Sequence, residues 1–205
     1  MKQLALGISP PSRPTLENFV PGANGELLAR LREFRAGKFA DVILYLWGEA
    51  GSGKSHLLQA CAGLHAVDDV ERLDDEGQIS AFDLYNALRE NNGALAASAA
   101  APPVQLTLRA DLVTRLAWGL VYQVHGLTDE SKAQALSDHA ARRGFRLPRE
   151  VCDYLLTRSQ RDLPSLLATL EALDRYSLET RRPVTVPLAR ELLHPAGRQD
   201  TASRI

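Results

Sequence analysis

One octapeptide constrains the fold more than any other feature of the chain. It reads GEAGSGKS at Gly48–Ser55, follows an apolar run at 42–47 and opens a helical pattern at 54–62. Its glycines allow the backbone to curl until N–H groups converge on one point, and the first turn of the following helix adds partial positive charge there. Because both the eight positions and their context match, the pattern predicts a P-loop; a chance glycine-rich turn is the weaker alternative.

A P-loop predicts bound ADP or ATP. We expect Lys54 to reach the β- and γ-phosphates and the hydroxyl of Ser55 to be a ligand of Mg²⁺. Backbone N–H groups along the loop would supply the other contacts. The predicted nucleotide-binding residues are therefore Gly48, Glu49, Ala50, Gly51, Ser52, Gly53, Lys54 and Ser55.

Two adjacent acids, Asp68 and Asp69, are the next candidates for chemistry. A P-loop ATPase needs a carboxylate that holds Mg²⁺, directly or through water, and a second acid can orient the attacking water. Asp74 and Asp75 follow closely, so an acidic surface loop is the alternative. The residues alone leave both interpretations open.

The pattern of apolar residues changes near residue 127. Before it, apolar runs alternate with amphipathic helical patterns, which predicts a parallel α/β sheet flanked by helices. The predicted elements there are helices at 26–35, 54–62, 75–90 and 111–118, and strands at 42–47, 95–98 and 120–125. We expect the helix at 75–90 to bury Ile79, Phe82, Tyr85 and Leu88.

After residue 127 only helical patterns remain, which predicts a separate small bundle. Its helices are expected at 128–143, at 148–158, from Asp162 onward and at 185–193. The expected organisation is a mobile tether at 1–14, a nucleotide-binding domain at 15–127, a helical domain at 128–195 and a loose tail at 196–205.

Composition excludes several classes of protein. Apolar residues make up 45% of the 205 and charged residues 24%, as in ordinary globular proteins. The net charge of −1 provides no broad basic field for nucleic acid. No apolar stretch reaches the roughly 20 residues of a membrane span, and the start lacks a signal-peptide pattern. We therefore expect a cytoplasmic protein in which Cys61 and Cys152 are buried free thiols.

Six segments resemble the AAA+ module of the DnaA family of replication initiators, and in particular the Hda group within it. They are Thr15–Phe19, Gly48–Leu58, Val67–Leu73, Phe82–Asn86, Arg109–Trp118 and Asp174–Pro187. The resemblance covers nearly the whole chain. It stops where DnaA continues into a helix-turn-helix domain, so we expect no direct sequence-specific DNA binding.

The resemblance implies roles for individual residues. Gly48–Ser55 match Walker A, Asp68 and Asp69 match Walker B, and Ser98 matches the polar sensor at the tip of a central strand. Arg115 matches the arginine finger, which would face the γ-phosphate on a neighbouring subunit. A surface arginine on a short helix is the alternative for Arg115. The helical domain at 128–195 matches the AAA+ lid.

Two departures from the family pattern bear on the chemistry. Pro164 stands where the lid helix carries the sensor-2 arginine, and Arg161, one turn away, would point differently. Only thirteen positions separate Ser55 from Asp68. A helix of ~8 residues rises ~12 Å, so this length closes one crossover and leaves no room for a second. We therefore expect either a break in the chain near 62–67 or a sheet that lacks one edge strand of the five in the family.

The N-terminus predicts a partner. Gln3, Leu4 and Leu6 resemble the short peptide with which replication proteins bind the β sliding clamp of DNA polymerase III. Position at a free end before a proline-rich tether suits a docking peptide; a merely disordered start is the alternative.

The resemblance implies a negative regulator that promotes hydrolysis of DnaA-bound ATP when docked on the clamp, with its own nucleotide site mainly regulatory. A self-sufficient ATPase and a non-catalytic adaptor between clamp and DnaA remain alternatives. Homo-oligomers are possible in this family, and no membrane partner is expected.

Overall fold

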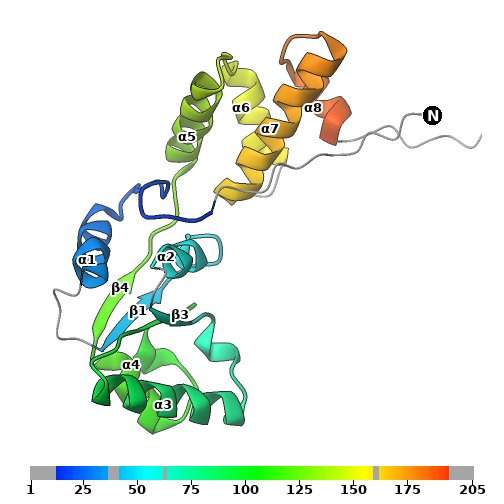
Figure 1. Cartoon of the computed structure of the whole chain (residues 1–205). Helices are drawn as coiled ribbons and strands as arrows, with labels where there is room; N and C mark the ends of the chain where they lie inside the picture. Colours follow the sequence, from blue (N-terminus) through cyan, green and yellow to red (C-terminus); the bar gives the residue numbers. More distant parts are fainter. Residues whose placement is uncertain (1–12, 37–41, 62–63, 159–161, 194–205) are drawn as a thin grey trace, which may run out of the picture. The chain divides into compact units, whose positions relative to one another are not determined.

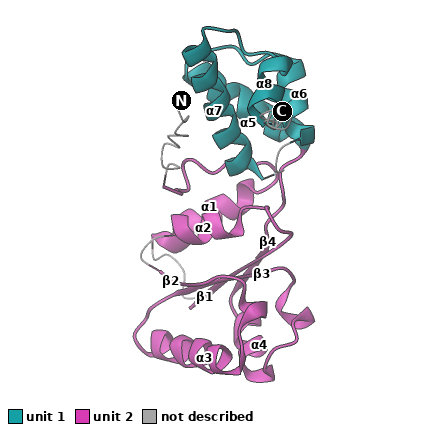
Figure 2. Cartoon of the chain, turned by 90° about the vertical axis from the view of Figure 1, so that its right-hand side faces the viewer, with its two compact units in different colours: residues 1–11, 129–205 teal, residues 12–128 magenta. Residues whose placement is uncertain are grey.

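The computed structural model describes residues 13–36, 42–61, 64–158 and 162–193 (Figure 1). The chain divides between Thr128 and Asp129 into two compact units (Figure 2). Each unit has its own apolar core, so each is considered by itself.

The described residues of unit 2, at 12–128, form a parallel sheet of four strands, in the order β2-β3-β1-β4. The strands are β1 (Ile43–Trp47), β2 (His65–Val67), β3 (Leu95–Ala99) and β4 (Leu120–Gln123). Helices α1 (Gly25–Arg35) and α2 (Lys54–Ala60) cover one face, and α3 (Asp75–Glu90) and α4 (Ala110–Ala117) cover the other (Figure 1). The predicted α/β class is confirmed.

Strand β1 explains why the sheet is buried on both faces. Leu44 and Leu46 pack with α1 and α2, whereas Ile43 and Tyr45 pack with α3 and α4. Successive side chains of a strand point to opposite faces, so a continuous apolar run supplies both cores at once. On the neighbouring strand β3, alanines and Ser98 fill the same role with small side chains.

The short spacing between the Walker motifs is accompanied by a sheet of four strands among the described residues, which is one of the two expected outcomes. Strand β2 follows α2 and forms the edge of the sheet against β3, and among the described residues no further strand lies beyond it. The sheet thus has one strand fewer than the five expected from the resemblance. Residues 62 and 63, where a break was an alternative, lie outside the described part of the chain.

The described part of unit 1, at 129–193, consists of four helices around one core. They are α5 (Asp129–Arg142), α6 (Arg149–Arg158), α7 (Leu163–Thr180) and α8 (Val186–Leu193). The side chain of Asp162 caps α7 by accepting a hydrogen bond from the Ser165 N–H at 2.9 Å. An ion pair of 2.8 Å between Arg143 Nε and Asp174 Oδ2 joins the chain after α5 to α7.

Some details differ from the sequence-based expectations. Ile79, expected to be buried, is 46% exposed, because α3 presents only the Ala81, Tyr85 and Leu88 side fully to the core. The strand expected at 120–125 ends at Gln123. Cys61 and Cys152 are buried free thiols as predicted, and burial raises the pKa of both. Within the described residues, no helix is long and apolar enough to span a membrane.

Candidate functional site

The P-loop connects β1 to α2 and requires glycine at two positions. Gly48 has φ +154°, and a Cβ there would lie 2.4 Å from the Val124 carbonyl oxygen. Gly53 has φ +102°, and a Cβ there would lie 2.7 Å from the ring of Phe19. The loop therefore takes its shape because these residues lack side chains.

Lys54 and Ser52 provide polar groups inside the curl of the loop. Lys54 is 8% exposed, and its Nζ donates to the Gly48 carbonyl at 2.7 Å and the Glu49 carbonyl at 3.0 Å. The Ser52 Oγ is buried and makes no hydrogen bond with any described residue. A buried ammonium, an unpaired hydroxyl and the N-terminus of α2 are a donor set that fits a phosphate group. Ser55 is exposed on the first turn of α2.

The acids and the predicted sensor lie together at the carboxyl end of the sheet. The Ser98 hydroxyl donates to Asp68 Oδ1, and the Asp69 N–H donates to Ser98 Oγ at 3.2 Å. Strand β1 ends beside them, since the Gly48 N–H donates to the Ala99 carbonyl at 3.2 Å. The structure therefore brings Asp68, Asp69 and Ser98 together with the entry of the P-loop, rather than dispersing the acids on a surface loop.

Asp69 is less free than Asp68 to act on a nucleotide. Its backbone is left-handed, with φ +50°, and its carboxylate pairs with Arg72 at 3.4 Å. Glu71 ties the same turn to the end of β3, because its Oε1 accepts the Ala100 N–H at 3.0 Å. No sequence pattern indicated the roles of Glu71 and Arg72, because both depend on a short 3₁₀ turn at Val70–Arg72. Across the described residues, no three His, Cys, Asp or Glu side chains form a metal cluster.

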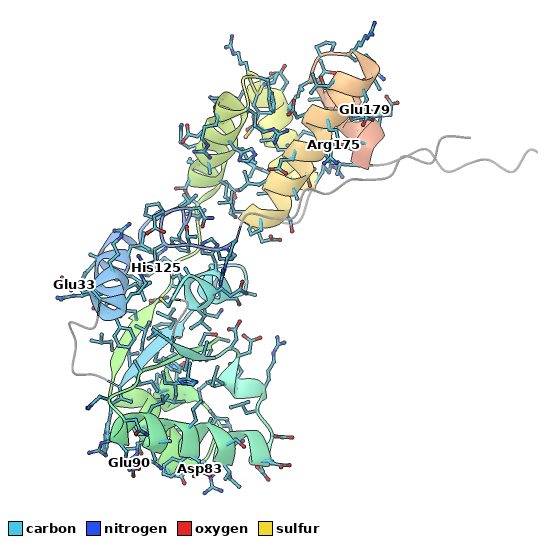
Figure 3. The ribbon with its side chains drawn as sticks, in the orientation of Figure 1. Glu33, Asp83, Glu90, His125, Arg175 and Glu179 are labelled. Carbon is cyan, nitrogen blue, oxygen red and sulfur yellow. The ribbon has the colours of Figure 1, made fainter. Side chains whose placement is uncertain are left out.

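The segment before α1 braces the P-loop helix. The Thr15 and Asn18 side chains each accept the other's backbone N–H, at 3.1 and 2.9 Å, and His56 Nε2 contacts the Thr15 carbonyl oxygen at 2.9 Å. The rings of Phe19 and His56 meet edge to face at 5.4 Å. His125, labelled in Figure 3, is bonded through its backbone to Asn24 by two hydrogen bonds of 2.8 Å. This brace was not predicted, since it joins residues far apart in sequence.

Arg115 lies near the end of α4 among aromatic rings. Its guanidinium carbon is 4.3 Å from the Trp118 ring centroid, 5.7 Å from that of Tyr85 and 5.8 Å from that of Phe82. Its Nε is buried without a hydrogen-bond partner, and no ion pair joins Arg115 to any described residue. Arg115 and Trp118 are three positions apart at the end of one helix, and so are Phe82 and Tyr85 along another, but spacing within each helix does not reveal that the two helices meet.

Arg109, six residues before Arg115, has different contacts. Its Nε and Nη2 donate to Asp111 at 3.3 and 3.0 Å. This hydrogen-bonded pair holds the pKa of the exposed Asp111 carboxyl below its ordinary value. The guanidinium of Arg109 is therefore bonded to a carboxylate of the same chain, whereas that of Arg115 pairs with no carboxylate among the described residues.

The start of α7 has no arginine. Its first turn reads Leu163, Pro164, Ser165, and Pro164 suits this place because the first N–H groups of a helix have no partner inside the helix. Arg161 and the clamp-peptide residues Gln3, Leu4 and Leu6 lie outside the described residues.

The helical residues after 128 are similar to a known family. Residues 129–193 match the family model described as "Hda, lid domain". We call these residues the Hda lid after this match. The Hda lid thus comprises α5 to α8.

Solved structures extend the likeness to the P-loop unit. Domain III of the Thermotoga maritima replication initiation protein DnaA shares 20% identity, with a TM-score of 0.70 over 94% of this chain and 99% of that one. AMPPCP-bound DnaA of Aquifex aeolicus shares 20%, with a TM-score of 0.67 over 84% and 67%. The Thermotoga maritima RuvB branch migration motor shares 12%, with a TM-score of 0.65 over 91% and 73%. The chain therefore shares the fold of DnaA domain III, and its residues 129–193 are similar to the Hda lid.

Proposed function

We propose that the chain is a negative regulator of replication initiation that promotes hydrolysis of ATP bound to DnaA. The observation that carries the proposal is Arg115, a cation held by rings with no carboxylate partner among the described residues. Together with the Hda lid, it supports action on a neighbour's nucleotide rather than a structural role.

The proposed chemistry is electrostatic. As water attacks the γ-phosphorus of ATP on DnaA, the bond to the ADP oxygen breaks and negative charge develops on the phosphoryl and leaving oxygens. The planar guanidinium of Arg115 would donate N–H bonds to these oxygens, where they stabilise the transition state more than the ground state. Arg109, by contrast, already donates from its Nε and Nη2 to Asp111.

For the chain's own site we propose ADP or ATP with Mg²⁺ in a mainly regulatory role. Lys54 and the loop N–H groups would hold the phosphates, and Ser55 and Asp68 would hold the ion, which neutralises phosphate charge when bound. Arg72 paired to Asp69 and proline at 164 both favour slow turnover, and thus argue against the self-sufficient ATPase.

Restoring an arginine at position 164 should change the chain's own nucleotide site. The Pro164→Arg variant is expected to bind ATP about 10-fold more tightly, since a hydrogen bond to a charged group contributes about 1.5–3 kcal/mol. Calorimetric titration with ATP measures this, and Pro164→Ala controls for loss of the proline. Equal affinity in all three proteins would show that position 164 does not reach the nucleotide.

Recruitment is proposed to depend on Gln3, Leu4 and Leu6, which would bind the sliding clamp. Replacing all three with alanine should abolish clamp binding and leave the melting temperature within about 1 °C, because the proposed role of these side chains is to contact the clamp. Surface plasmon resonance on immobilised clamp tests the first point and calorimetry the second. Clamp affinity that survives the triple change would locate docking elsewhere on the chain.

One reconstituted assay separates the three functions. ATP-loaded DnaA is incubated with clamp-loaded DNA, with and without the purified chain, and phosphate release is followed. A trans-acting regulator accelerates release from DnaA, a self-sufficient ATPase releases phosphate without DnaA, and an adaptor binds both partners without either effect. Because its proposed partners act on the chromosome, we also propose a cytoplasmic location.

A further inference from the structure

Three rings surround the arginine on which the proposed function depends. Trp118 is nearest, and its backbone N–H donates to the Arg115 carbonyl at 3.1 Å, which fixes the two residues together at the end of α4. Tyr85, 4% exposed, and Phe82 contribute from α3. On the same helix the exposed acids Asp83 and Glu90 project outward, away from the sheet (Figure 3).

Aromatic rings hold a guanidinium in a way that a carboxylate cannot. A ring attracts the cation through its face, so the in-plane N–H groups stay available as donors. Arg109, in the same segment, is held by a carboxylate instead, and two of its N–H groups are bonded to Asp111. An arginine that donates to phosphate oxygens of another subunit needs a fixed orientation and free N–H groups, and stacking on rings provides both.

We propose that Trp118 is a positioning residue for Arg115: its indole face, backed by Tyr85 and Phe82, holds the guanidinium oriented for a phosphate outside the subunit. This inference rests on the proposed function. Trp118 is 58% exposed, so its replacement removes little buried surface. The replacement would remove the ring that lies 4.3 Å from the Arg115 guanidinium carbon.

The arrangement itself is tested without DnaA. A guanidinium above an indole face lies in the ring current, so the Arg115 Nε–H signal should be shifted upfield in a nitrogen–proton correlation spectrum, and Arg115→Ala identifies it. Trp118→Leu should return the signal to the ordinary arginine position, and Trp118→Phe should retain part of the shift. A signal that does not move in Trp118→Leu overturns the stacking.

The consequence is tested with ATP-loaded DnaA, clamp and DNA by varying the concentration of each variant. Trp118→Leu should lower the maximal rate about 10-fold, since small misplacement of a transition-state group is costly, while the half-saturating concentration changes less than about 2-fold. Trp118→Phe should recover most of the rate. Leu178→Ala, a change at an exposed apolar residue of the Hda lid, is the control and should match the unmodified protein.

Two outcomes overturn the inference. An unchanged maximal rate in Trp118→Leu would show that the indole does not position Arg115. A raised half-saturating concentration with the maximal rate intact would make Trp118 a partner contact. Failure of the proposed function is distinct: the unmodified protein would then not accelerate release from DnaA, or Arg115→Ala would accelerate it equally, whatever the Trp118 variants do.

Discussion

Replacing Arg115 with alanine should abolish stimulation of DnaA-bound ATP hydrolysis, with a loss of about 10³–10⁵-fold in the accelerated rate. The loss is large because the guanidinium meets charge that develops only in the transition state. The variant should still fold, bind the clamp and keep its own nucleotide, since Arg115 makes no ion pair with the described residues and its ring contacts contribute only about 1 kcal/mol each.

Phosphate release from ATP-loaded DnaA on clamp-loaded DNA measures the effect. Arg109→Ala is the matched control, because it removes the same charge from the same segment but disturbs an internal pair with Asp111; it should reduce stimulation only mildly. Arg115→Lys should be nearly as impaired as alanine, because an ammonium lacks the planar fork that bridges two oxygens. Full stimulation by Arg115→Ala would show that Arg115 is not the trans-acting arginine finger.

Loss of the Lys54 ammonium should weaken ATP and ADP binding by about 100-fold or more. In the structure this ammonium lies within the loop on the Gly48 and Glu49 carbonyls, so it is already directed into the curl where phosphates would bind. Charge-assisted bonds to phosphate contribute about 1.5–3 kcal/mol each, and two of them account for the expected loss.

Nucleotide carried through purification of Lys54→Ala, and calorimetric titration with ADP and ATP, test this prediction. Lys132→Ala removes the same charge from the Hda lid, where Lys132 pairs with Asp129 at 3.6 Å, and should bind nucleotide normally. Undiminished affinity in Lys54→Ala would refute the assignment of the loop.

The P-loop unit was predictable because its signals are local. The apolar run before Gly48 and the glycines after it determine strand, loop and helix within about twenty residues, and the helix at Asp75–Glu90 has a capping aspartate and a clear period. A sheet that lacks one edge strand was one of the two outcomes predicted from the distance between Ser55 and Asp68, because that distance is a limit on chain length rather than a propensity.

The surroundings of Arg115 could not be predicted in the same way. Phe82 and Tyr85 share a helical face with other apolar residues, and nothing in that periodicity distinguishes a ring that packs in the core from one that faces a cation. The bond between Ser98 and Asp68 and the brace from Thr15 to His56 likewise join residues about thirty or forty positions apart. Such contacts arise from the topology of the sheet, which sequence spacing specifies only in outline.

The two ends of the sheet have a consequence for behaviour at high concentration. The edge strands β2 and β4 contain three and four residues, respectively. A second chain that added itself to either edge would gain only a few ladder hydrogen bonds, and short edges are one of the ways in which natural sheets avoid aggregation. Because both edge strands are short, neither edge of the described sheet offers a second chain many free backbone groups for pairing.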